Sequence, residues 1–304
     1  MWCKTCNLET NNSVCPICGK ETVEDIPIEV FWCDACQVPL SHTTNAADKG
    51  VCSICGKKTR YLTTDLRPVF PEERLLLALL LGKKPDEYMY SSVWATNSRY
   101  YINGKSVLMS VNDYLKADAD IIIQKLSEAN HVIDYKGFDD SMRHFIRANR
   151  HRLSYLKDEA LSFVRNAAKS FREENIVISF SGGKDSTVTA DLVFKALSNP
   201  SLVHIFGNTT LEFPTTIEYA ERYRKNHPMA IFQVAKNDEQ VFYDVCEDIG
   251  PPARMMRWCC SMFKTGPISR TINSLYRSQQ ILTFYGIRKS ESVSRSKYNR
   301  IEDE

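Results

Sequence analysis

The sequence lacks long apolar runs, a secretory leader and a strong excess of either charge. Its longest apolar segment, Leu75–Leu81, is far shorter than the roughly 20 residues that cross a bilayer, and Met1–Lys4 does not open an apolar signal segment. The formal net charge is only +2, so overall charge identifies neither a nucleic-acid nor an anionic-membrane partner. We therefore expect a cytoplasmic protein with no membrane partner.

Cysteine is absent from most of the chain and concentrated at its start. Eight of the 11 cysteines form four Cys-x-x-Cys pairs that end at Cys55, and the next cysteine is Cys246. This spacing is typical of metal knuckles rather than of a disulfide scaffold, and Gly19 and Gly56 after the second pairs relieve the tight turns. Four thiolates complete a tetrahedral shell, so residues 1–65 are predicted to form two ribbons with two structural zinc ions; iron is the main chemical alternative. The predicted ligands are Cys3, Cys6, Cys15 and Cys18 in one set and Cys33, Cys36, Cys52 and Cys55 in the other.

Two segments of different character follow the cysteine pairs. Residues 66–140 predict a small α+β module, and apolar residues at helical spacing predict a helical linker over residues 141–174. In the module we expect a helix at Glu72–Leu81, strands around Ser92–Ile102 and Ser106–Ser110, and a helix or strand near Asp118–Leu126.

From residue 175 to 304, apolar strands alternate with helices. The expected strands are Ile176–Phe180, Leu202–Phe206, Ile231–Val234 and Ile281–Tyr285, and the expected helices are Thr187–Leu197, Pro214–Asn226, Asp238–Asp248 and Pro267–Tyr276. This alternation predicts an α/β fold with a doubly wound parallel sheet, covered on both faces and connected by right-handed crossovers.

A glycine turn directly follows the first of these strands and precedes a helix. It reads Ser181-Gly182-Gly183-Lys184-Asp185-Ser186-Thr187. Glycines let backbone amides close around phosphate oxygens, the helix start presents unpaired amides, and the serine hydroxyls add donors. Lys184 supplies a positive charge, while Asp185 either holds magnesium or caps the helix. The alternative is an ordinary strand-to-helix turn with a capping serine.

This string resembles the pyrophosphate-loop (PP-loop) signature Ser-Gly-Gly-x-Asp-Ser of the adenine nucleotide alpha-hydrolase superfamily. Three later segments resemble motifs of the phosphoadenosine phosphosulfate (PAPS) reductase family. Asn208–Thr216 is similar to Asp-Thr-Gly-x-x-Phe-Pro-Glu-Thr, Arg257–Cys260 with Lys264 is similar to a Cys-Cys and lysine region, and Gly286–Ser292 with Arg295 is similar to Gly-x-Arg-x-x-Glu-Ser-x-x-Arg. The resemblance implies that residues 181–187, Arg288 and Arg295 bind ATP or an adenylyl sulfate (PAPS or APS). It further implies sulfur metabolism, with Lys184, Asp185, Cys259 and Cys260 as catalytic candidates.

The sequence departs from the family pattern in two places. Asn208 stands where an acidic residue is usual, and the sequence contains no Glu-Cys-Gly-x-His segment, which carries the thiol nucleophile of sulfonucleotide reductases. The adjacent Cys259 and Cys260 therefore have three interpretations: ligands of an iron–sulfur cluster with Cys246 as a third thiolate, redox-active or sulfur-carrying thiols, or structural residues. Arg254, Arg257 and Lys264 would lower the thiol pKa if they approach.

Three functions remain open at this point. The first is a PAPS reductase-type enzyme of sulfur transfer or sulfonucleotide chemistry, with a sulfur donor or reductant protein as partner. The second is an enzyme that uses ATP to introduce sulfur into tRNA or DNA, and the third is a non-catalytic nucleotide-sensing scaffold. A basic patch on a predicted helix would serve the second, or would be a solvated face: Arg143, His144, Arg147, Arg150, His151 and Arg152.

Overall fold

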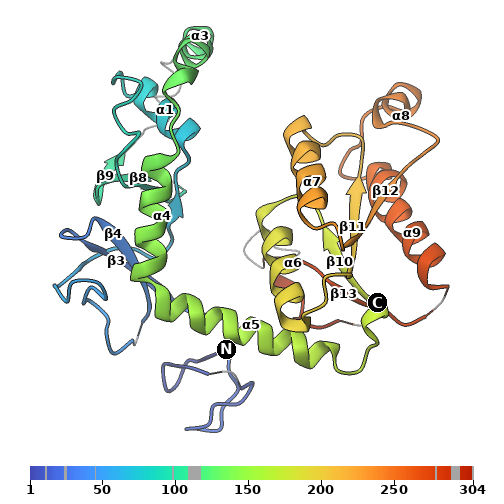
Figure 1. The fold of residues 1–304 in the computed structure, drawn as a ribbon, viewed down its shortest axis with the longest axis horizontal. Helices are drawn as coiled ribbons and strands as arrows, with labels where there is room; N and C mark the ends of the chain where they lie inside the picture. Colours follow the sequence, from blue (N-terminus) through green and yellow to red (C-terminus); the bar gives the residue numbers. More distant parts are fainter. Residues whose placement is uncertain are drawn as a thin grey trace. The chain divides into compact units, whose positions relative to one another are not determined.

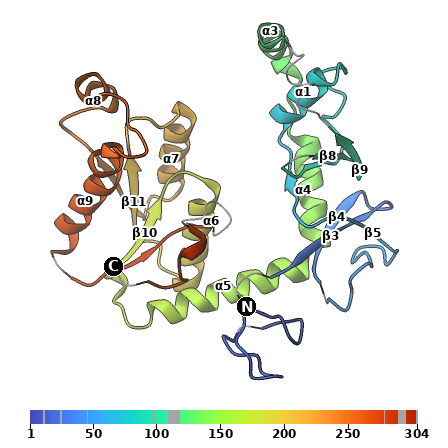
Figure 2. The same ribbon diagram turned by 180° about the vertical axis from the view of Figure 1, so that it is seen from behind.

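The computed structural model describes residues 1–302 except 11, 24–25, 45, 98, 109–117, 278 and 289–294. The chain forms two compact units, Met1–Leu156 and Lys157–Glu304 (Figures 1 and 2). Helix α5 (Arg150–Ala168) begins in the first unit and ends in the second. None of the helices built from the described residues is long and apolar enough to cross a membrane. The finer domain division expected from the sequence stays a prediction.

The described part of the first unit contains three small antiparallel sheets. The first ribbon pairs β1 (Trp2–Cys3) with β2 (Leu8–Glu9). The second ribbon has the strand order β4 (Val38–Thr43), β3 (Ile28–Cys33), β5 (Arg60–Thr63). The third sheet has the order β6 (Arg67–Pro68), β7 (Val93–Ala95), β8 (Arg99–Ile102), β9 (Lys105–Leu108).

Among the described residues, this unit also contains the helices α1 (Pro71–Leu80), α3 (Ala119–Ala129) and α4 (Lys136–Ala148). The segment near Asp118–Leu126, expected to be a helix or a strand, is a helix, because the Asp118 carboxylate caps it by accepting hydrogen bonds from the amides of Asp120 and Ile121. The strands expected around Ser92–Ile102 and after Ser106 are β7, β8 and β9, while the predicted end at Met109 and Ser110 lies outside the described residues.

The second unit is built on one parallel sheet. Its order is β12 (Ile231–Lys236), β11 (Val203–Asn208), β10 (Ile176–Phe180), β13 (Leu282–Phe284), and every neighbouring pair is parallel. The α/β fold with a doubly wound parallel sheet is confirmed.

Helices cover both faces of this sheet (Figure 1). Successive side chains of a strand point to opposite faces, so Ile176, Ile178 and Phe180 of β10 pack against α5, α6 (Lys184–Leu197) and α7 (Pro214–Asn226). Val177 points to the other face, toward Tyr276 of α9 (Gly266–Tyr276). The long apolar strand sequences follow from this burial on both sides.

Two predicted helix starts are wrong. Helix α6 begins at Lys184 rather than Thr187, because Gly183 already takes the extended N-cap conformation, with φ −84° and ψ 163°. Helix α8 (Phe242–Ile249) begins after Asp238, because the Asn237 side chain accepts the amides of Glu239 and Gln240 and holds those residues in a turn.

The strand order places a topological switch beside β10. Strands β10, β11 and β12 follow one another in one direction, and β13 then adds on the opposite side of β10. In open parallel sheets, ligands bind beyond the carboxyl ends of the strands at this kind of position. The glycine turn after β10 and the segment after β13 both leave the sheet there.

Candidate nucleotide site and metal centres

The glycine turn after β10 is held by its own hydroxyl groups. Gly182 has φ +72°, a conformation that favours glycine, and a Cβ there would lie 3.2 Å from Thr216 Cγ2 of α7. The Ser186 hydroxyl donates to the Gly183 carbonyl (2.9 Å) and accepts the Ser181 amide (3.1 Å). The backbone of the loop is therefore preformed, and Gly182 rather than Gly183 is the glycine that its conformation requires.

The hydroxyl groups of this loop are already engaged. Ser186 is only 5% exposed, and its oxygen also lies 3.1 Å from Ser181 Oγ. Thr187 donates to the Gly183 carbonyl (2.9 Å) and lies 3.0 Å from the Tyr219 hydroxyl of α7. Phosphate contacts of Ser186 and Thr187 stay a prediction, since those hydroxyls support the loop here. Ser181, Gly183 and Lys184 are exposed, so the turn and the first residue of α6 face solvent.

The segment after β13 packs directly onto this loop. A Cβ on Gly286 would lie 2.7 Å from the Asp185 carbonyl group and 2.8 Å from the Ser186 amide nitrogen. Two residues later, Arg288 Nε donates to Asp185 Oδ2 at 3.1 Å. The structure thus brings together Arg288 and Asp185. Arg295 lies in the short turn Arg295–Lys297, and Lys289–Ser292 lie outside the described residues.

The segment after β11 forms a second hydrogen-bonded turn. Asn208 Oδ1 accepts the Thr210 amide (2.8 Å), and the Glu212 carboxylate accepts the amide and hydroxyl of Thr209 (2.9 and 2.8 Å). Thr210 stands where the family motif has glycine, and it has φ +68°. Its hydroxyl accepts the Phe242 amide at the start of α8 (2.9 Å). Sequence reasoning missed this role of Thr210, although the glycine position in the motif was a signal.

Cys259 caps, and Cys260 opens, the π-helical turn Cys260–Thr265, which precedes helix α9. Their sulfur atoms lie 4.0 Å apart, and Arg257 Nη2 lies 3.7 Å from Cys260 Sγ. Burial, and then the neighbouring Cys260 thiol, raise the pKa of Cys259. The charge of Arg257 lowers this pKa, as expected of a basic neighbour, but burial outweighs it. Among the described residues, the potential metal ligands group only at the N-terminal ribbons, and Cys246 does not join this pair. An iron–sulfur cluster here stays a hypothesis.

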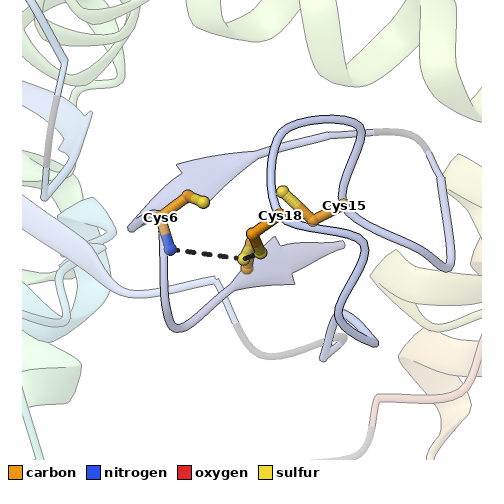
Figure 3. A group of neighbouring side chains, drawn as sticks. Cys6, Cys15 and Cys18 are labelled. Atoms are coloured by element: carbon orange, nitrogen blue, oxygen red, sulfur yellow. Dashed lines mark hydrogen bonds between the residues drawn. The ribbon is translucent and has the colours of Figure 1, made fainter.

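The eight ribbon cysteines gather in two groups. In each group the sulfur atoms lie within 4.8 Å of one another; Figure 3 shows Cys6, Cys15 and Cys18 converging in the first. Zn–S bonds of about 2.3 Å in a tetrahedron require sulfur separations of about 3.8 Å. The separations are 3.5 Å for Cys3–Cys18, 3.7 Å for Cys33–Cys55 and 3.9 Å for Cys36–Cys52. Both groups fit a zinc ion.

The thiol pKa values show why a cation suits these groups. The backbone amide of Cys18 lowers the pKa of Cys15 to about 7, while the Cys18 thiol raises the pKa of Cys6 to about 12. In the second ribbon the Lys57 amide lowers the pKa of Cys55 to about 7, and burial raises the pKa of Cys36 to about 12. Four adjacent thiols cannot all ionise unless a cation compensates their charge.

Comparisons with known proteins agree with the motif resemblance. Residues 175–304 match the family model described as phosphoadenosine phosphosulfate reductase domain. This part of the chain is similar to that family. The match supports an adenine nucleotide-binding PP-loop domain.

Two curated relatives come from Methanocaldococcus jannaschii. The uncharacterized protein MJ0066 is 31% identical over 167 residues, which are 55% of this chain and 34% of the relative. The uncharacterized protein MJ0973 is 29% identical over 160 residues, 52% of this chain and 37% of the relative. The matched region thus spans about a third of the length of each relative. A solved structure, the NH3-dependent NAD synthetase from Campylobacter jejuni in complex with nitrate, is 15% identical with a TM-score of 0.34, and the match covers 45% of this chain and 58% of that one.

Proposed function

We propose that the loop Ser181–Thr187 binds the phosphates of an adenine nucleotide, either ATP or an adenylyl sulfate. On this proposal, residues 175–304 use it in sulfur transfer or sulfonucleotide chemistry. The observation that carries the proposal is the preformed glycine turn at the topological switch point, with Gly183 and Lys184 exposed at the start of α6. The PAPS reductase family match supports the same nucleotide class.

Lys184 and Arg288 supply the positive charge for such an anion. Lys184 is exposed at the first residue of α6, and the side chain of Arg288 is half exposed beside the same loop. Asp185 fits magnesium as a carboxylate ligand, and a magnesium ion there would balance the charge of the nucleotide phosphates. We assign Cys259 and Cys260 to the sulfur chemistry, with a sulfur donor or reductant protein as the partner.

Titration calorimetry of Lys184→Ala tests the nucleotide site. A hydrogen bond to a charged group contributes roughly 1.5 to 3 kcal/mol, so affinity for ATP or for an adenylyl sulfate should fall by about one to two powers of ten. Lys195→Ala is the matched control, since Lys195 lies in the last turn of the same helix and bonds Asp191. Equal affinities in the two variants would contradict a phosphate site at this loop.

Product analysis separates the functional alternatives. Sulfite release from an adenylyl sulfate would identify sulfonucleotide chemistry, and pyrophosphate release from ATP would identify an adenylating sulfur-transfer enzyme. Nucleotide binding with neither product, in the presence of reductant and sulfide, would identify a sensing scaffold.

One observation favours sulfur modification of tRNA or DNA as the second candidate. It is not the predicted helix patch, because two of its arginines are neutralised: Arg143 pairs with Asp140, and Arg152 pairs with Glu9. The observation that favours this candidate is a separate basic cleft in the first unit.

A further inference from the structure

A cleft of about 560 Å³ lies in the first unit between the second ribbon and the neighbouring sheet. Residues of β5 form one wall, and residues of the β8–β9 hairpin form the other. The walls are fixed against each other. Gly104, in the hairpin turn with φ +75°, lies so close to the Trp32 indole that a Cβ would come within 2.3 Å of it. Arg60 Nη2 also donates across the cleft to the Gly104 carbonyl (2.7 Å).

The lining carries an excess of positive charge. Its cations are Arg60, Arg99 and Lys105, and its only acid is Asp34, which pairs with Arg60 at 3.3 Å. Arg99 and Lys105 are exposed, and neither forms an ion pair with any residue that the structure describes. Arg99 lies three residues before Ile102, the partner of Lys105 in the hairpin. At about 3.4 Å per residue, the two cations attach about 10 Å apart along the hairpin, Arg99 on the Tyr101 face and Lys105 on the Ile102 face, and both line the cleft.

Two aromatic side chains accompany these charges. Tyr61 on β5 is 54% exposed, and its ring is supported by Phe31 at 5.8 Å in an edge arrangement. Tyr101 on β8 is only 6% exposed and packs with Trp32 and Trp94 below the cleft. Tyr61 therefore offers a positioned ring to a ligand, while Tyr101 belongs to the floor.

We propose that this cleft binds single-stranded nucleic acid, with Tyr61 stacking on a base and Arg99 and Lys105 contacting backbone phosphates. Pockets for small molecules are mostly apolar and enclose their ligand, whereas these walls carry exposed charged side chains spread along a groove. Separated cations beside an exposed aromatic ring are the arrangement that tracks a phosphate backbone and stacks its bases. The site is distinct from the loop at residues 181–187 and does not depend on its function.

Fluorescence anisotropy with the zinc-loaded full chain tests this site. The probes are labelled single-stranded RNA and DNA of one mixed sequence, with a mononucleotide as competitor. We expect Arg99→Ala combined with Lys105→Ala to weaken oligonucleotide binding at least about tenfold. The slope of log affinity against log salt should fall by about 1.4, since each phosphate contact on a single strand contributes roughly 0.7. Tyr61→Leu should cost a further factor of about ten by removing the stacked base.

The control is Lys83→Ala combined with Lys84→Ala, which removes the same charge from another exposed site of the first unit. Unchanged zinc content and circular dichroism show that each variant is folded. Preference for RNA or for DNA would identify the strand that binds. The proposal is overturned if neither strand binds, if the Arg99 and Lys105 variant matches the control, or if the mononucleotide displaces the strand at equal concentration.

Discussion

The contact of Gly286 with the phosphate loop gives a direct test of the site geometry. In Gly286→Ala the new Cβ would stand 2.7 Å from the Asp185 carbonyl group and 2.8 Å from the Ser186 amide, and both are backbone atoms that cannot rotate away. Either the loop or the segment after β13 must move. Overpacking of this kind typically costs 1 to 3 kcal/mol. Because Asp185 and Ser186 form the first turn of α6, the displacement falls on the proposed phosphate site.

Two measurements on the same variant check this reasoning. Hydrogen–deuterium exchange of the peptide spanning β10 and α6 should accelerate by about one to two powers of ten, the equivalent of 1 to 3 kcal/mol. Adenine nucleotide affinity should fall in parallel. The control for the exchange measurement is Gly183→Ala, whose Cβ would meet only Ser181 Oγ at 3.4 Å. It does not control the affinity, because Gly183 belongs to the proposed phosphate loop. It should lose about 0.5 kcal/mol through the poorer N-cap. Normal protection of α6 in Gly286→Ala would refute the packing argument.

Three further predictions concern the ribbons and the second unit. Elemental analysis should find two zinc ions per chain, and Cys6→Ser or Cys36→Ser should each remove one; a full complement in both variants would contradict the ligand sets. Burial lowers the pKa of His204 below 6.5. The unfolded state therefore binds more protons below about pH 6.5, so the free energy of unfolding should decrease as the pH is lowered through this range. The decrease should be less steep in His204→Gln, and urea denaturation at several pH values measures it. Thr210→Val keeps the left-handed backbone but loses the hydrogen bond to the Phe242 amide, so it should destabilise the protein by about 1 kcal/mol. Thr210→Gly loses the same hydrogen bond but relieves the backbone strain, so its stability should stay near that of the unmodified protein. Equal urea midpoints for the two variants would argue against this.

The sheet and its order of elements were predictable because burial leaves a strong sequence signal. Strand Ile176–Phe180 is apolar along its length since both of its faces are covered, and helix Pro214–Asn226 has the predicted bounds because Pro214 fixes its first turn. The cysteine pairs were equally informative, because metal knuckles are local in sequence. The start of α8 was missed although Asn237 carried a turn signal, since apolar spacing alone does not locate a helix start.

The site contacts were less predictable because they join distant segments. Nothing near Gly286 in the sequence indicates that its backbone meets Asp185, and nothing near Tyr219 indicates that it supports Thr187. The net shift of the Cys259 pKa was not predictable for a related reason. Basic residues nearby in sequence were visible, whereas the burial that outweighs them depends on the folded packing around the π-helical turn.

The pairing of Asp185 with Arg288 is consistent with both residues contacting a nucleotide. The two side chains are 30% and 50% exposed, and ion pairs at exposed positions contribute about 0 to 1 kcal/mol. A charge-assisted hydrogen bond from Arg288 to a phosphate contributes roughly 1.5 to 3 kcal/mol. Binding of a phosphate can therefore displace Asp185 from Arg288 with a net gain, and the released carboxylate is then available to a magnesium ion. Without a nucleotide, the same pair neutralises both charges at the opening of the loop.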